Sequence, residues 1–182
     1  MVRLLAPALL VALAVQGCNE RKDPMEPVKT ATATATATAA VGSAESRSRA
    51  KPLLTRRRDR TAPLEQFVQQ HVEQAEVSGA RVLVYVGATW CQPCKHFHKA
   101  LETGELDEPL AGTHFLEFDA DDDRAELRAA GYGSKYIPLF SVPDSSGHGT
   151  TLSIEGSIKA DQAVRENLVP RLLALLDGKV TD

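Results

Sequence analysis

The sequence predicts an α/β domain in which a mixed β-sheet is flanked by helices. Between residues 61 and 178, stretches with apolar residues at helical spacing alternate with short β-rich runs, in the order α-β-α-β-α-β-β-α. That order is typical of a mixed sheet with helices on both faces. The chain has 182 residues, of which 43% are hydrophobic. This size accommodates one such domain and additional segments.

The domain is predicted to begin with a helix and a central strand. Thr61 caps the helix, Pro63 lies in its first turn, and apolar residues follow at helical spacing until Gly79 ends it. In the β-rich run 81–86, no charged residue follows Arg81, as expected of a strand that is buried on both faces.

The next element is a second helix that begins near Cys91. The acidic run 119–123 is interpreted as a turn that caps a short helix, because it lacks the glycine and the terminal glutamate of an EF-hand calcium loop. Pro170 removes a backbone N–H inside the closing helix. The remaining predicted elements are strands over residues 113–118, 139–142 and 150–154, the short helix that ends at Gly131, and the closing helix over residues 160–176.

The N-terminus has the features of a bacterial lipoprotein signal peptide. Arg3 precedes an apolar run of about 12 residues, whereas a helix that crosses a bilayer needs roughly 20. The run ends in Leu13-Ala14-Val15-Gln16-Gly17-Cys18, which resembles the lipobox, whose cysteine is lipidated and becomes the new N-terminus. We therefore expect an exported protein, anchored by lipid on Cys18 at the periplasmic face of a bacterial membrane. The alternatives are an ordinary signal peptide with an incidental cysteine and an unexported core helix.

Residues 18–60 are expected to form a disordered, flexible linker. They include a Thr-Ala alternation from residue 30 to residue 40 and almost no large apolar residues, so they cannot bury a core. The run Arg56-Arg57-Arg58 is interpreted as solvated, and the alternative is that it lies near anionic lipid. The predicted organisation is a signal peptide over residues 1–17, the linker over 18–60 and the folded domain over 61–182.

The charge and the cysteine content exclude several classes of protein. The 21 Lys and Arg residues are balanced by 24 Asp and Glu residues, whereas a dedicated nucleic-acid-binding protein carries a basic excess. We therefore expect no nucleic-acid partner. Three cysteines are too few for a small disulfide-built protein, and the distance of Cys18 from Cys91 and Cys94 indicates two separate roles.

The chemistry is expected in the segment Trp90-Cys91-Gln92-Pro93-Cys94-Lys95, which follows the central strand. At the N-terminus of a helix, free N–H groups and the helix dipole favour a thiolate, which makes Cys91 the attacking sulfur. Cys94 lies within one helical turn of Cys91 and can attack a mixed disulfide to release the bound partner.

This segment resembles the W-C-x-P-C-K active-site motif of the thioredoxin family, and the resemblance extends over about residues 61–178. It implies a thioredoxin fold and a thiol–disulfide oxidoreductase in which Cys91 and Cys94 carry the electrons, with no organic cofactor. Tyr136-Ile137-Pro138 is similar to the cis-proline segment of the family. The resemblance therefore implies that Ile137 and Pro138 contact the bound protein substrate, and we also expect Trp90 to contact it.

The resemblance also bears on direction and on partners. The Gln92-Pro93 dipeptide is closer to that of thioredoxin than to those of strong oxidants, and the surrounding sequence resembles the reducing thioredoxin-like domains of periplasmic disulfide-interchange proteins. We therefore expect a reductase that acts on protein disulfides. Because exported compartments are oxidising, such a reductase needs a membrane partner that supplies electrons.

One position departs from the family pattern. Thioredoxins carry a buried aspartate six residues before the first cysteine, where it assists proton transfer at the second, and here Tyr85 occupies that position. Two other residues are candidate proton acceptors: His98, on the same helix face as Cys94, and Glu117, on the next strand. The alternative is that both side chains are simply exposed.

The alternative function is a redox-inert thioredoxin-like module that binds a partner or handles a metal.

The spacing of cysteines and histidines also has a superficial similarity to zinc sites. Residues two apart on a helix point in different directions, so His96 and His98 cannot both face an ion held by the cysteines. We therefore expect no metal site. The zinc site that this geometry still permits has Cys91, Cys94, His98 and an external molecule as its ligands.

Overall fold

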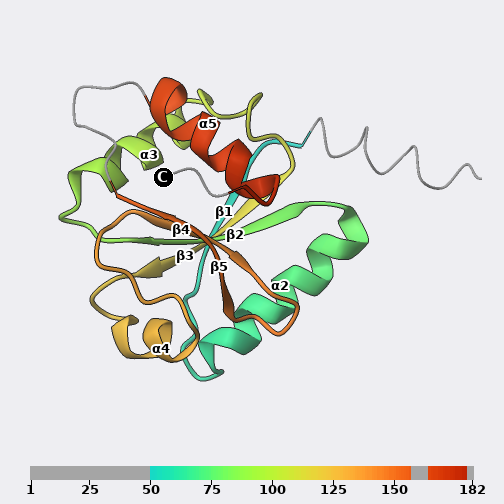
Figure 1. Cartoon of the computed structure of the whole chain (residues 1–182), viewed down its shortest axis with the longest axis vertical. Coiled ribbons are helices and arrows are strands. Elements are labelled where there is room, and N and C mark those ends of the chain that lie inside the picture. Colours follow the sequence, from blue (N-terminus) through green and yellow to red (C-terminus); the bar gives the residue numbers. More distant parts are fainter. Residues whose placement is uncertain (1–49, 157–163, 180–182) are drawn as a thin grey trace, which may run out of the picture. The chain divides into compact units, whose positions relative to one another are not determined.

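The computed structural model describes residues 50–156 and 164–179 (Figure 1). The predicted signal peptide, the lipidation site Cys18 and the linker as far as residue 49 lie outside the described residues, as do residues 160–163 of the predicted closing helix. Within the described part of the chain, no helix is both long enough and apolar enough to cross a bilayer.

The described elements alternate between helix and strand as predicted, with one additional strand at the start. They are β1 (Leu53–Arg56), α2 (Leu64–Ser78), β2 (Arg81–Gly87), α3 (Gln92–Glu102), β3 (Thr113–Asp119), α4 (Arg124–Ala129), β4 (Leu139–Pro143), β5 (Gly149–Glu155) and α5 (Val164–Leu176). The predicted α/β class with a mixed sheet is confirmed.

The five strands form one sheet in the order β1-β3-β2-β4-β5. Strand β3 pairs in parallel with both β1 and β2, whereas β4 pairs antiparallel with β2 and with β5. Strand β2 therefore lies in the middle of the sheet, as its uncharged sequence predicted. The turn between β4 and β5 is closed by Asp144, whose Oδ1 accepts hydrogen bonds from the backbone N–H groups of Ser146 and His148 at 2.8 and 2.9 Å.

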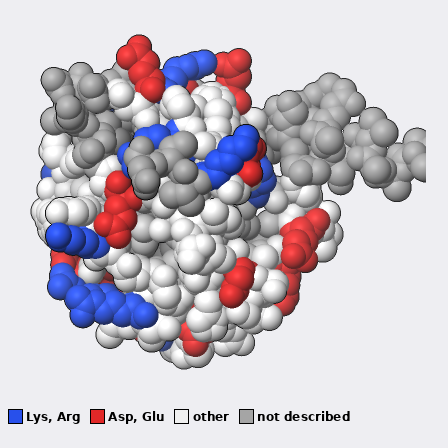
Figure 2. All heavy atoms as spheres, in the orientation of Figure 1, with Lys and Arg blue, Asp and Glu red and all other residues white. Residues whose placement is uncertain are grey.

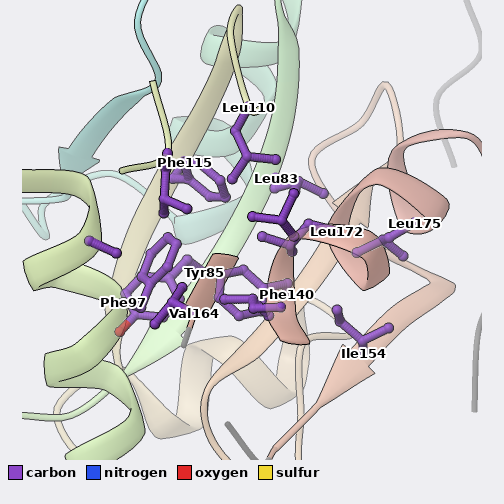
Figure 3. Close-up of a cluster of buried hydrophobic side chains, with 14 of the residues drawn as sticks. Leu83, Tyr85, Phe97, Leu110, Phe115, Phe140, Ile154, Val164, Leu172 and Leu175 are labelled. Atoms are coloured by element: carbon purple, nitrogen blue, oxygen red, sulfur yellow. The ribbon is translucent and has the colours of Figure 1, made fainter. Parts of the chain in front are cut away.

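Helices cover both faces of the sheet, with α3 and α5 on one face and α2 and α4 on the other (Figure 1). Successive residues of β2 point to opposite faces, because side chains alternate along a strand. Tyr85 belongs to the same buried cluster as Phe97 of α3 and Leu172 of α5 (Figure 3), whereas Val84 belongs to a second cluster with Val68 of α2.

The boundary predicted at residue 61 is wrong, because the fold begins earlier. Strand β1 pairs with β3 from Leu53 to Arg56. Arg57, interpreted from the sequence as part of a solvated run, has a buried side chain. Its guanidinium donates hydrogen bonds to Glu126 Oε2 at 2.7 Å and to the carbonyl oxygen of Ala62 at 2.6 Å. The arginine run is therefore the end of an edge strand and the start of its connection to α2.

The predicted helix ends are mostly confirmed, with one difference. Gly79 caps the C-terminus of α2 at a φ of 70°, in the left-handed region that glycine tolerates. At the N-terminus of α2 the cap is Pro63 and not Thr61. Pro63 makes no side-chain capping hydrogen bond, because it has no polar side chain.

Charged side chains of both signs are mixed on the surface. Figure 2 shows Lys and Arg side chains beside Asp and Glu side chains on the face in view. Some of these charges are paired, such as Arg165 with Glu108 at 2.8 Å and Arg124 with Asp121 at 3.0 Å.

Candidate active site

Cys91 and Cys94 form a disulfide at the start of α3, with their Cα atoms 5.2 Å apart. Cys91 is the N-cap residue of this helix, and the backbone N–H of Cys94 donates a hydrogen bond to Cys91 Sγ at 3.3 Å. After reduction, the same N–H group and the helix dipole would stabilise a thiolate at Cys91. This geometry favours the attacking role that the sequence predicts for Cys91.

The two sulfurs lie at the edge of the hydrophobic core. Cys91 is 4% exposed and Cys94 is 1% exposed, and both belong to the buried cluster between the sheet and helices α3 and α5. Ile137, which precedes the cis peptide bond to Pro138, packs against the same cluster. The sequence-predicted cis-proline segment and the cysteine pair therefore meet in one part of the fold.

Two large apolar side chains beside this pair are exposed to solvent. Trp90, which precedes Cys91, is 64% exposed, and Tyr136, which precedes Ile137, is 58% exposed. The indole N–H of Trp90 donates a hydrogen bond to Asp121 Oδ2 at 2.7 Å, which fixes one edge of the ring. An exposed aromatic ring that is held in place offers contact area at low entropic cost, so the substrate-contact role predicted for Trp90 stays a prediction with favourable geometry.

The two predicted proton acceptors are hydrogen-bonded to each other. His98 Nε2 lies 3.1 Å from Glu117 Oε1, and Arg56 holds the same carboxylate from β1 through its Nε and Nη2 atoms, at 3.0 and 2.8 Å from Oε2 and Oε1. Burial alone would raise the pKa of Glu117, but the hydrogen bonds and positive charges of His98 and Arg56 lower it to about 2. Glu117 is therefore a weak base and a poor proton acceptor, and the acceptor role predicted for His98 stays a prediction.

A cavity of about 420 Å³ opens beside this cluster. His98 and Glu117 line it together with Gly87 and Ala88, the residues that lead from β2 toward Cys91. The basic side chains of Arg56 and Lys95 also line it. The cavity gives solvent a route to the helix face that carries His98.

Tyr85 lies on β2 directly beside Glu117, its register partner on β3. Its ring packs against those of Phe97 and Phe140, with centroid distances of 4.8 and 5.2 Å (Figure 3). The side chain is 0% exposed. Burial, and then the nearby charge of Glu117, raise the pKa of Tyr85, so its hydroxyl stays protonated.

The described residues do not gather into a metal site. No group of three or more His, Cys, Asp or Glu side chains with metal-binding geometry occurs among residues 50–156 and 164–179. His96 contacts Gln92 Nε2 at 3.2 Å, and His98 contacts Glu117. Both imidazoles are therefore engaged by partners other than the cysteines.

Several residues of the site were not predicted from the sequence. Arg56 binds Glu117 from a strand that was assigned to the linker, and Asp121 anchors Trp90 from a run that was interpreted only as a helix cap. Both contacts are between residues far apart in the chain. The contact between Asp121 and Trp90 could have been anticipated, because Asp121 follows β3 and Trp90 follows β2. The ends of two neighbouring parallel strands lie close together.

The strand order, the strand directions, the Cys-x-x-Cys pair at the start of α3 and the cis-proline before β4 together define the architecture. The chain has a thioredoxin fold. This fold extends from β1 through α5, and so includes residues 53–60 in addition to the range predicted from the sequence.

Solved thioredoxins are among the structures similar to this chain. The thioredoxin of Trichomonas vaginalis is 20% identical and aligns over 69% of this chain and 95% of its own, with a TM-score of 0.41. A poplar thioredoxin h is 21% identical and aligns over 70% of this chain and 97% of its own, with a TM-score of 0.40. Oxidised thioredoxin O1 from Arabidopsis thaliana is 14% identical over 72% and 99%, with a TM-score of 0.41. The sequence matches no family model and no curated protein.

Proposed function

We propose that this protein is a thiol–disulfide oxidoreductase that reduces disulfides in other proteins through Cys91 and Cys94. The observation that carries the proposal is the position of this pair, with Cys91 at the N-cap of α3 and Cys94 one turn further, within bonding distance. A cysteine pair at a helix N-terminus has a stabilised attacking thiolate and a second thiol placed to complete the exchange.

The exchange proceeds in two displacements. The Cys91 thiolate attacks one sulfur of the substrate disulfide, the substrate S–S bond breaks, and the leaving sulfur takes a proton from solvent. Cys94 then gives its proton to a base, for which His98 is the candidate, and attacks the Cys91 sulfur. This second step forms the Cys91–Cys94 disulfide and releases the other substrate sulfur as a thiolate. Two electrons pass from the dithiol to the substrate, and a separate reductant must return them.

The surface around the disulfide supports a protein as the substrate. Trp90 and Tyr136 are exposed and lie next to Cys91 and to the Ile137–Pro138 segment respectively. Aromatic side chains of this kind are enriched where one protein contacts another. The proposed substrate-binding residues are therefore Trp90, Ile137 and Pro138, and no organic cofactor takes part.

The proposed location rests on the N-terminal sequence. The apolar run and the lipobox-like segment that ends at Cys18 support export, removal of residues 1–17 and lipid anchoring at the periplasmic face of a bacterial membrane. In that oxidising compartment the electrons would come from a membrane partner. Cys18→Ser should move the protein from the membrane fraction to the soluble fraction, and an unchanged distribution would contradict the anchor.

Trapping of mixed disulfides tests the proposed activity. Cys94→Ser removes the thiol that releases the substrate, so the variant should accumulate disulfide-linked adducts with other proteins on non-reducing gels. Cys91→Ser is the matched control, because it keeps one cysteine of the pair but removes the attacking one. Equal adducts in both variants, or none in either, would contradict the scheme.

A further inference from the structure

The hydroxyl of Tyr85 is an unpartnered polar group in the core. Among the described residues, this oxygen has no hydrogen-bond partner, although the side chain is fully buried. Buried hydroxyl groups in native proteins are nearly always hydrogen-bonded, and an exception calls for a physical explanation. The matched case in this chain is Tyr132, whose equally buried hydroxyl donates a hydrogen bond to the carbonyl oxygen of Gly147 at 2.8 Å.

Cys94 lies beside the Tyr85 hydroxyl. A Cβ atom built on Gly87 would clash with the Tyr85 hydroxyl oxygen and would lie 3.4 Å from Cys94 Sγ. The hydroxyl therefore fills the space that a side chain at residue 87 would take, and the Cys94 sulfur borders that space. No hydrogen bond joins them while Cys94 is in the disulfide.

The other polar neighbours of Tyr85 already have partners. The Glu117 carboxylate on β3 accepts hydrogen bonds from Arg56 on β1 and is paired with His98 on α3. The remaining neighbours, Phe97 on α3 and Phe140 on β4, are apolar rings. The Cys94 sulfur is the group near the Tyr85 hydroxyl that changes from a disulfide to a thiol or thiolate during the reaction.

Opening the disulfide turns this sulfur into an acceptor. A disulfide sulfur accepts hydrogen bonds weakly, whereas a thiolate carries a full negative charge and accepts them strongly. Cys94 is buried, and burial disfavours a thiolate unless a donor faces it. The charge of the nearby Glu117 carboxylate is paired with Arg56 and His98. A protonated hydroxyl at this position would offset the effect of burial.

We propose that the Tyr85 hydroxyl donates a hydrogen bond to the Cys94 sulfur once the Cys91–Cys94 bond opens, and so stabilises the Cys94 thiolate. The proposal rests on the function proposed above. In the second displacement the Cys94 thiolate attacks Cys91, the substrate leaves as a thiolate, and Tyr85 keeps its proton throughout. The hydrogen bond is lost as the sulfur becomes neutral in the new disulfide. Tyr85 is thus a stabilising donor, whereas the aspartate found at this position in thioredoxins assists proton transfer.

The test is Tyr85→Phe, which removes the hydroxyl and keeps the ring packed against Phe97 and Phe140. In the full chain with Cys91→Ser, the rate of Cys94 alkylation is followed against pH by peptide mass. Loss of the donor should raise the pKa of Cys94 by about one unit or more, since a hydrogen bond to a charged group is worth at least a tenfold change in equilibrium. Tyr132→Phe is the control and should leave the Cys94 pKa unchanged.

The release step gives a second readout. With Cys91 present, Tyr85→Phe should slow the attack of Cys94 on a preformed mixed disulfide by about tenfold at neutral pH. An unchanged Cys94 pKa in Tyr85→Phe, or an equal change in Tyr132→Phe, would overturn the proposal. The alkylation experiment needs no substrate protein, so its result stands even if the chain fails to trap partners. Failure of the proposed function would instead appear as absent adducts with Cys94→Ser.

A measurement on the unmodified sequence covers the case in which Tyr85→Phe does not fold. The tyrosine Raman doublet reports whether a tyrosine hydroxyl donates a hydrogen bond. The intensity ratio of its two bands should change between oxidised and reduced protein, because the Tyr85 hydroxyl gains a hydrogen-bond acceptor. An identical doublet in the two states would overturn the proposal.

Discussion

Gly87 borders the ring of Tyr85 so closely that a Cβ added at Gly87 would lie 2.8 Å from Tyr85 Cζ. The ring has little freedom to withdraw, because Phe97 and Phe140 pack against it. The absence of a side chain at residue 87 is therefore a steric requirement. Glycine is required at residue 87 because residue 85 is a tyrosine, whose hydroxyl extends toward the end of β2.

Gly87→Ala should destabilise the fold by about 1–3 kcal/mol, the usual cost of adding a methyl group to a tightly packed site. Chemical denaturation measures this change. Gly133→Ala is the control, since a Cβ there would meet Arg128 Cγ at 3.3 Å and the flexible side chain can move. If both variants were equally stable, the close packing between Gly87 and Tyr85 would be contradicted.

Arg57→Met should lower the free energy of unfolding by about 2–3 kcal/mol, because it leaves Glu126 and the Ala62 carbonyl oxygen without their donor. The neighbouring Arg58 is exposed, so Arg58→Met should change stability by no more than about 0.5 kcal/mol. Urea denaturation of the two variants compares them directly. Equal effects would mean that the arginine run is solvated, as the sequence alone indicated.

Stability should fall in acid because of His114. Burial and the nearby His71 lower the pKa of His114 from 6.5 to about 4. Between these values the unfolded chain binds a proton that the folded chain does not, so stability is lost as the pH falls from about 6.5 to about 4. The shift sets an upper limit of roughly 3 kcal/mol, which solvent screening of the partly buried ring reduces. His114→Gln should flatten this pH dependence, whereas His148→Gln, at an exposed turn, should retain it.

His98→Gln should slow the release step by roughly 10²-fold, at the lower end of general acid–base effects. The physical reason is that Glu117, with a pKa of about 2, is ionised but too weak a base to take a thiol proton. His96→Gln on the same helix is the control. An unchanged release rate in His98→Gln would exclude His98 as the proton acceptor.

Much of this fold was predictable because it depends on local patterns. The uncharged run of β2, the turn at Asp144 and the Trp-Cys-x-x-Cys segment each carry their signal within a few consecutive residues. Strand β1 was missed because it has only 4 residues and lies between Pro52 and a run of arginines, a composition typical of a linker. Its stability comes from pairing with β3, which no local pattern reports.

The site was predictable to the extent that its chemistry lies in one helix turn. Cys91 and Cys94 could be identified from their spacing. His98 and Glu117 could be identified as candidates, but the contact between them could not be predicted. Their hydrogen bond depends on how α3 packs over β3, and Arg56 completes the cluster from a third element. The role proposed for Tyr85 depends on how its hydroxyl packs against Gly87 and near Cys94, which only the packed core reveals.

The reduction potential of the Cys91/Cys94 pair tests the central claim most directly. The protein is equilibrated with thiol buffers of known potential, and the reduced fraction is followed by alkylation. We expect a value near that of thioredoxin, about −270 mV, as for a reductase supplied with electrons by a partner. A value near that of the strong oxidant DsbA, about −120 mV, would contradict a reductase. A pair that does not interconvert with the buffers would contradict a redox function altogether.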